Sequence, residues 1–65
     1  MDNDRIEGKW TEIKGQIRET YGDLTDDEVE RAKGDREQLE GLFQQRLGKT
    51  KDEARKAVDD VLEKI

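Results

Sequence analysis

The chain has 65 residues, of which 48% are charged and only 29% are hydrophobic, and its formal net charge is -5. A chain of this length forms one small domain, residues 1–65, with a net stability of about 3–5 kcal/mol. The acidic balance repels phosphate, which disfavours nucleic acid as a partner, and the lack of a long apolar run excludes a membrane-spanning segment. We expect a cytoplasmic protein that is monomeric or weakly dimeric.

Groups that carry out catalysis are scarce in this composition. The sequence contains no His, no Cys and no Ser, so it lacks the proton shuttle that works near neutral pH and the two commonest nucleophiles. Without Cys it forms neither a disulfide nor a thiolate metal site. We therefore predict no catalytic residue, no cofactor and no metal, and a protein that is not an enzyme.

The first helix is predicted to run from about Asp4 to Tyr21, with Asn3 or Asp2 as its N-cap. Its apolar residues are spaced by three or four, which places them on one narrow face that packs on a core. Gly22 follows directly, and we predict that it ends the helix in the left-handed conformation, which glycine adopts without steric cost. The apolar face consists of Ile6, Trp10, Ile13, Ile17 and Tyr21.

A new helix start follows this stop within a few residues. Thr25 and Glu28 have the spacing of a capping box, in which each side chain accepts a hydrogen bond from the other residue's backbone N–H. Leu24 and Val29 flank the box in the positions of a hydrophobic staple. These signals predict a second helix over about Asp26–Lys33.

The third helix is predicted over about Arg36–Leu47, after a stop at Gly34 and with Asp35 as its N-cap. Gly48 is expected to end it in the left-handed conformation. Its apolar face consists of Leu39, Leu42, Phe43 and Leu47.

The fourth helix is predicted over about Lys51–Lys64, where Thr50 and Glu53 form a second capping box. Its apolar face consists of Ala54, Ala57, Val58, Val61, Leu62 and Ile65.

The chain repeats its own pattern. The order of helix, glycine, short turn and capped helix occurs in residues 13–29 and again in residues 39–54, which indicates two αα-hairpins. One hairpin cannot bury both of its apolar faces, so we predict an all-α fold, a small four-helix bundle made of two packed αα-hairpins that form an internal pseudo-repeat. The expected core consists of Trp10, Ile13, Ile17, Tyr21, Leu24, Val29, Leu39, Phe43, Leu47, Val58 and Val61.

Several longer motifs occur in order along the chain. They are Trp10-x-x-Ile13-Lys14-Gly15-x-Ile17, Tyr21-Gly22-x-Leu24-Thr25-Asp26-Asp27, Gly34-x-Arg36-x-x-Leu39-x-Gly41, Gln45-Arg46-Leu47-Gly48 and Lys51-Asp52-Glu53-Ala54. In this order and spacing they resemble the CsbD-like family of small bacterial proteins, although Tyr21 and the C-terminal Glu63-Lys64-Ile65 depart from the family's pattern. The resemblance implies a small all-helical fold and a role in the response to general, osmotic or envelope stress. It implies no catalytic activity and no ligand, so no functional residue carries over.

Two features admit a structural and a functional interpretation. Trp10 lies on the apolar face of the first helix, where it is either a core anchor or an exposed recognition residue, and its position favours the core. The acidic cluster at the start of the second helix suggests a divalent cation site, but it lacks the order of a calcium loop, and helix capping explains it. That cluster consists of Asp23, Asp26, Asp27 and Glu28.

Gly8, Gly15 and Gly41 lie inside predicted helices and away from their apolar faces. Three interpretations are open. The glycines are neutral surface positions, they let another backbone of this chain or of a partner approach closely, or they keep the helices marginally stable. A basic side of the first helix is a further candidate surface for phosphate or an acidic partner, although a solvated face is the simpler explanation. That side consists of Arg5, Lys9, Lys14 and Arg18.

The favoured function is a non-enzymatic bacterial general stress-response protein that acts as a hydrophilic protectant. The alternative is a small adaptor that docks on an unknown protein partner through an exposed helix face. An exposed apolar patch around Leu24, Leu47 or Ile65 would favour the adaptor. Nucleic-acid binding through the basic side is a distant third, because the net charge opposes it.

Overall fold

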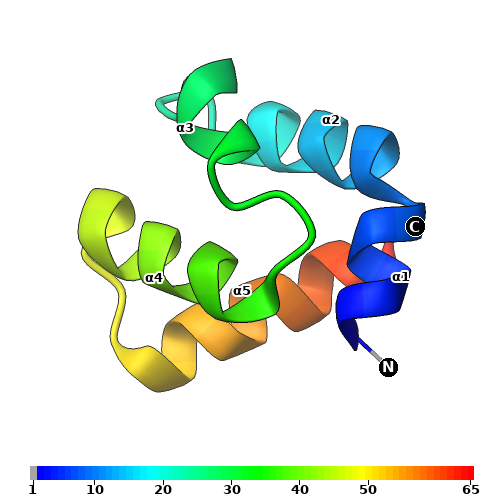
Figure 1. The fold of residues 1–65 in the computed structure, drawn as a ribbon. Helices are drawn as coiled ribbons and strands as arrows, with labels where there is room; N and C mark the ends of the chain where they lie inside the picture. The colour runs from blue at the N-terminus through cyan, green and yellow to red at the C-terminus, as the bar shows by residue number, and fades with distance from the viewer. Residues whose placement is uncertain (1) are drawn as a thin grey trace.

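The computed structural model describes residues 2–65, and this part of the chain contains five α-helices and no strand (Figure 1). The all-helical prediction is confirmed, whereas the four-helix bundle of two equivalent hairpins is not what the structure shows. The helices are α1 Asp2–Gly8, α2 Trp10–Thr20, α3 Asp26–Glu30, α4 Arg36–Leu47 and α5 Lys51–Glu63. None of the helices in residues 2–65 combines the length and the apolar character needed to cross a membrane.

The extra helix arises because the first predicted helix breaks at Lys9. The backbone there has φ -116° and ψ 22°, which is outside the helical range, and α2 begins anew at Trp10. Gly8, a weak helix former, directly precedes the break. The bend lets α1 pack against α4 while α2 packs against α3 and α5, and it leaves both Ile6 and Trp10 buried.

The predicted left-handed stop at Gly22 is wrong. The C-cap of α2 is Tyr21, with φ -122° and ψ 74°, and the chain turns through a hydrogen bond of 3.0 Å from the Leu24 backbone N–H to the Tyr21 carbonyl. Among residues 2–65, the glycines with positive φ are Gly34 at 77° and Gly48 at 65°. The turn therefore stops α2 without a left-handed residue, while Gly48 ends α4 as expected.

The second predicted helix is shorter than expected, because α3 ends at Glu30 and not at Lys33. The Ala32 and Lys33 backbone N–H groups donate to carbonyls three residues earlier, at 3.0 and 3.1 Å, which is the pattern of a tightened 3₁₀-type turn. The left-handed Gly34 then leads into Asp35, the N-cap of α4. With only five residues in α3 against thirteen in α5, the two helix pairs are not equivalent.

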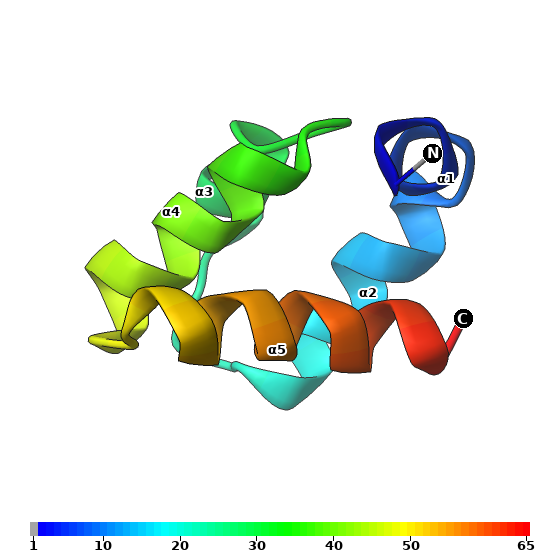
Figure 2. The same cartoon turned by 90° about the horizontal axis from the view of Figure 1, so that it is seen from below.

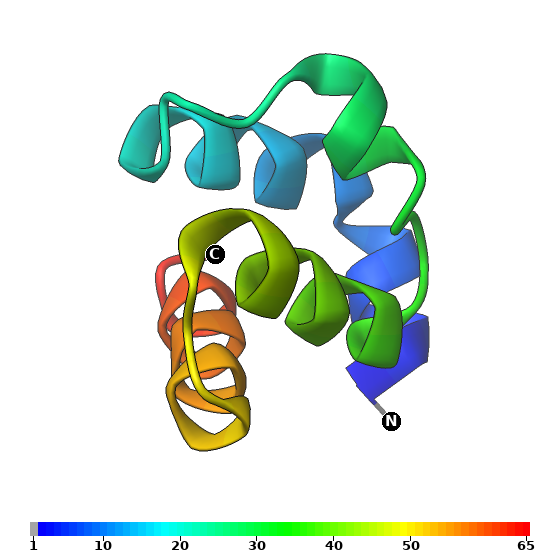
Figure 3. The same ribbon diagram turned by 90° about the vertical axis from the view of Figure 1, so that its left-hand side faces the viewer.

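The helices form two layers with α1 at one side. Figure 3 shows α2 and α3 in the upper layer and α4 and α5 in the lower layer. In Figure 2, which views the molecule from below, α5 runs across the picture, with α4 near its N-terminal half and α1 and α2 near its C-terminal half. The helix α5 packs on α4 and on α2, and α3 bridges α2 and α4. At the end where α1 meets α5, the Arg5 guanidinium donates to the Leu62 carbonyl at 2.6 Å.

The core between these layers is one cluster of apolar side chains. It contains the residues expected from the sequence except Tyr21 and Leu47, which are only partly buried because each lies at the end of its helix. The Tyr21 ring packs on Phe43 with a centroid distance of 5.3 Å, and the Lys49 ammonium lies 5.7 Å from the Tyr21 centroid. The cluster consists of Ile6, Trp10, Ile13, Ile17, Leu24, Val29, Ala32, Leu39, Phe43, Ala54, Ala57, Val58, Val61 and Leu62.

Candidate functional site

The carboxylates of the two capping boxes are engaged with backbone. Glu28 N–H donates to the Thr25 hydroxyl at 3.2 Å and Thr25 N–H donates to Glu28 Oε1 at 3.0 Å. Thr50 and Glu53 make the same pair of bonds at 3.2 and 2.9 Å. The bonds from the threonine backbone N–H are the largest cause of the lowered pKa values of the Glu28 and Glu53 carboxyls. The acidic residues at these helix starts therefore have a structural use.

The rest of the acidic cluster that suggested a cation does not assemble into a site. Asp26 faces α2, where it pairs with Arg18 at 3.1 Å. Within residues 3–65, no three acidic side chains come together in an arrangement that would hold a metal ion.

A network of charges joins α2 to α3. The Trp10 indole N–H donates to Glu30 Oε1 at 2.6 Å, and the Lys14 ammonium lies 3.2 Å from the same oxygen. Lys14 also lies 3.8 Å from Asp26 Oδ1. The indole hydrogen bond, and after it Lys14, lower the pKa of the Glu30 carboxyl. Trp10 is therefore a core anchor, 6% exposed, whose polar edge reaches a surface carboxylate.

This network also occupies the basic side that the sequence offered as a binding surface. Lys14 and Arg18 are paired with carboxylates of α3, and Arg5 is bonded to a carbonyl of α5. Of the four basic side chains, only that of Lys9 makes no hydrogen bond or ion pair with the part of the chain that the structure describes. The side that would meet phosphate is thus largely neutralised within the fold.

Arg36 is a structural centre that the sequence did not single out. Its guanidinium lies 2.8 Å from Glu40, 2.6 Å from Asp59 and 3.1 Å from the Arg55 carbonyl, which ties α4 to α5. Its backbone N–H donates to Asn3 Oδ1 at 2.9 Å, which ties α4 to α1. The spacing of Arg36 and Glu40 was visible in the sequence, but the partners in α1 and α5 were not.

Asn3 therefore does not act as the N-cap predicted for its own helix. It lies inside α1 and accepts from the first residue of α4 instead. The side chain of Asp2, the other candidate cap, lies outside what the structure describes.

The three helix-interior glycines do not mark close approaches within the fold. A Cβ placed on Gly8, Gly15 or Gly41 meets no atom of the described chain within 4 Å. The within-chain version of the close-approach interpretation is therefore wrong. Gly8 and Gly15 lie on the exposed surface, whereas Gly41 is half-buried and lines a groove.

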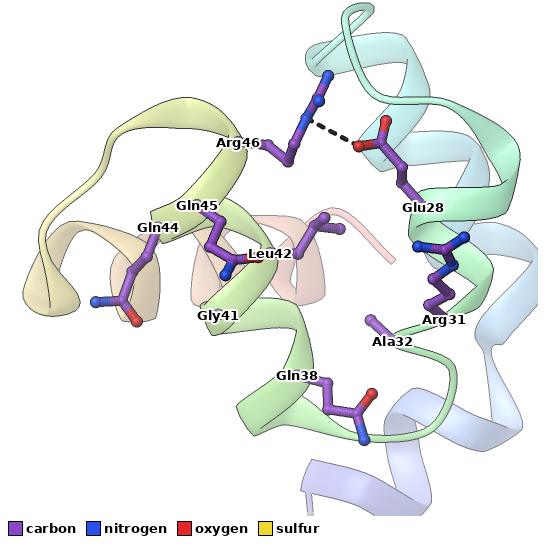
Figure 4. Close-up of a pocket in the computed structure, with 9 residues that line it drawn as sticks. All are labelled: Glu28, Arg31, Ala32, Gln38, Gly41, Leu42, Gln44, Gln45 and Arg46. Carbon is purple, nitrogen blue, oxygen red and sulfur yellow. Dashed lines mark ion pairs between the residues drawn. The ribbon is translucent and has the colours of Figure 1, made fainter.

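That groove, of about 590 Å³, lies between α3 and α4 and is a candidate binding site (Figure 4). Arg46 Nε lies 2.9 Å from Glu28 Oε2 and connects the two helices at one end. Leu42 points from α4 toward Arg31 and Ala32 on the opposite wall. The lining residues are Glu28, Arg31, Ala32, Gln38, Gly41, Leu42, Gln44, Gln45 and Arg46.

This groove was not predicted from the sequence. One signal was available, because Gln38, Gly41, Leu42 and Gln45 are spaced by three, one and three and so share one face of α4. The opposing wall was not predictable, because its position depends on how α3 packs on α4.

Comparison of this chain with known proteins shows its family. The CsbD-like family matches residues 4–56. A UPF0337 protein of Pseudomonas aeruginosa is 42% identical over 65 residues, covering 100% of both chains. A UPF0337 protein of Bordetella pertussis is 42% identical over 64 residues, which is 98% of this chain and 97% of the relative. The UPF0337 protein YjbJ of Escherichia coli (strain K12) is 43% identical over 60 residues, which is 92% of this chain and 87% of the relative. No solved structure matches.

Proposed function

The chain belongs to the CsbD-like family, and from that premise we propose that it is a non-enzymatic bacterial stress-response protein that acts as a hydrophilic protectant. In this role it keeps aggregation-prone proteins hydrated and apart when water is withdrawn. A cytoplasmic location and a monomeric or weakly dimeric state are part of the proposal.

The observation that carries this proposal is the complete separation of apolar and charged side chains. The sequence has 13 basic and 18 acidic residues, and no polar or charged residue in the described part of the chain is buried. The large apolar side chains of the described residues are buried or packed against the core. Such a surface holds much water for its mass, and the net charge of -5 keeps copies apart.

The carboxylates give no support to a catalytic alternative. A general acid that works near neutral pH needs a raised pKa, as a carboxyl has in an apolar pocket. The pKa values of Glu28, Glu30 and Glu53 are lowered, and each shift is caused first by a capping or indole hydrogen bond.

The alternative function, an adaptor that docks on a protein partner, would be favoured by an exposed apolar patch around Leu24, Leu47 or Ile65, and these residues form none. Leu24 is 2% exposed, and Leu47 and Ile65 pack against the core. Nucleic-acid binding is likewise disfavoured, because Lys14 and Arg18 are paired with carboxylates of α3.

The test is a drying assay with a labile enzyme. Lactate dehydrogenase is dried and rehydrated with this protein, or with an equal mass of an unrelated folded acidic domain of similar size. The proposal expects more activity to survive with this protein. Equal survival with both would remove the protectant role.

A charge variant tests whether the surface is the cause. The side chains of Glu19, Glu37 and Glu63 are exposed and make no hydrogen bond or ion pair with the described chain, so changing all three to Gln should leave the fold intact. The net charge would change from -5 to -2. The matched control changes Lys51 and Lys56 to Arg, which keeps the charge. The proposal expects weaker protection from the Gln variant and unchanged protection from the Arg variant, at equal helix content.

A further inference from the structure

The groove between α3 and α4 has the size of a ligand-binding site. Its volume of about 590 Å³ falls in the range of roughly 300–1,000 Å³ that is typical of ligand sites. One wall is the face of α4 that carries Gln38, Gly41, Leu42 and Gln45 (Figure 4). Gly41 leaves this wall open, since a Cβ there would meet nothing within 4 Å. An extended chain can therefore lie close to the backbone of α4.

The polar groups on the walls are available to a partner. Arg31, Gln38 and Gln45 are exposed, and their side chains make no hydrogen bond or ion pair with the described chain. The amides of Gln38 and Gln45 each offer a donor and an acceptor, which suits the backbone of an extended peptide. Leu42 is half-buried and offers apolar surface between them.

The charge of the groove identifies the kind of partner. Two arginines and one glutamate line it, so its local charge is +1, whereas the whole chain carries -5. Glu28 already accepts bonds from Thr25 and Arg46, and Arg31 makes only a small electrostatic contribution to the lowered pKa of Glu28 without forming an ion pair with it. A complementary partner therefore brings a carboxylate to Arg31. The negative surface elsewhere repels a long acidic run, so the partner carries few acidic groups.

We propose that the α3–α4 groove binds a short extended segment of another protein, in which one apolar side chain packs on Leu42 and a neighbouring carboxylate pairs with Arg31. This recognition is separate from the protectant role, which depends on the whole surface.

The experiment is an NMR titration of the uniformly ¹⁵N-labelled full chain. The probes are short peptides with blocked ends, each containing one Leu or Phe and a nearby Glu, and the number of residues between the two differs from peptide to peptide. A second set has Lys in place of Glu. The proposal expects a member of the acidic set to shift the Gly41 and Leu42 amides and the side-chain amides of Gln38 and Gln45. The Lys set should leave these signals in place.

Two pairs of variants separate groove binding from general effects. Arg31→Gln should weaken binding about tenfold, the effect of losing one charge-assisted hydrogen bond, and Arg55→Gln, an exposed arginine of α5 outside the groove, should not weaken it. Gly41→Ala puts a methyl group into the groove and should weaken binding, whereas Gly15→Ala on α2 should not.

Three results would overturn the proposal. The first is the absence of groove shifts with every acidic peptide. The second is equal loss of binding in Arg31→Gln and Arg55→Gln, which would indicate only general charge attraction. The third is a shift of the groove signals with the concentration of the protein itself, which would make a second copy of the chain the occupant.

Discussion

Replacing Gly15 by Ala is expected to stabilise this protein. Gly15 lies in the middle of α2, its φ is not positive, and an added Cβ meets no atom of the described chain within 4 Å. The methyl group therefore causes no clash and gains no packing. What remains is helix propensity, because glycine has more backbone freedom to lose on folding than alanine.

The expected gain is about 1 kcal/mol. Against a net stability of about 3–5 kcal/mol for a domain of this size, that gain is a large fraction. For a chain of this length it raises Tm by about 4–8 °C. The side chain of residue 15 stays in solvent, so burial adds nothing to the figure.

The assay is thermal and urea unfolding followed by far-UV circular dichroism, at two protein concentrations. The control is Gly48→Ala, because Gly48 has φ 65° and alanine there is strained by about 1–2 kcal/mol, so the sign of the change reverses. A neutral or destabilising Gly15→Ala would refute the reasoning. A loss that grows with protein concentration would instead point to close approach by a second chain.

Three further predictions concern the core, the charged network and pH. Trp10→Ala should lower the free energy of unfolding by about 3–5 kcal/mol, which is comparable with the whole stability, so circular dichroism should show an unfolded chain. Trp10→Phe should stay helical. A folded Ala variant would contradict the core role. Arg36→Met should lower the free energy of unfolding in urea by about 1–3 kcal/mol, because the side chain is only 19% exposed and joins α4 to α5. Asp59→Asn should lower it less, since Asp59 is 62% exposed. Equal losses would refute this ranking. The lowered pKa of Glu28 means that its contribution is present above the ordinary value of 4.5 and is lost as the pH falls from there through the folded-state value. The stability difference between the natural chain and Glu28→Gln should therefore shrink at acid pH, and a difference that grows there would reverse the assigned direction.

The sequence by itself determined the local signals of this protein. Thr25 with Glu28, Thr50 with Glu53, the Asp35 cap and the left-handed Gly48 are all found as predicted. Each depends on groups three or four residues apart, whose geometry follows from the spacing alone. The apolar spacing likewise indicated most of the core, because a residue's place on a helix face follows from its position.

Tertiary structure decided where those helices break and what they meet. The bend at Lys9 lets α1 and α2 bury their apolar sides against different neighbours. Gly8 alone does not predict it, because Gly15 lies inside α2 without a break. Asn3 and Arg36 are 33 residues apart, so only the folded chain brings the Asn3 side chain to the Arg36 backbone N–H at the start of α4. The groove has the same origin, because its walls belong to two helices and its width depends on how closely side chains pack between them.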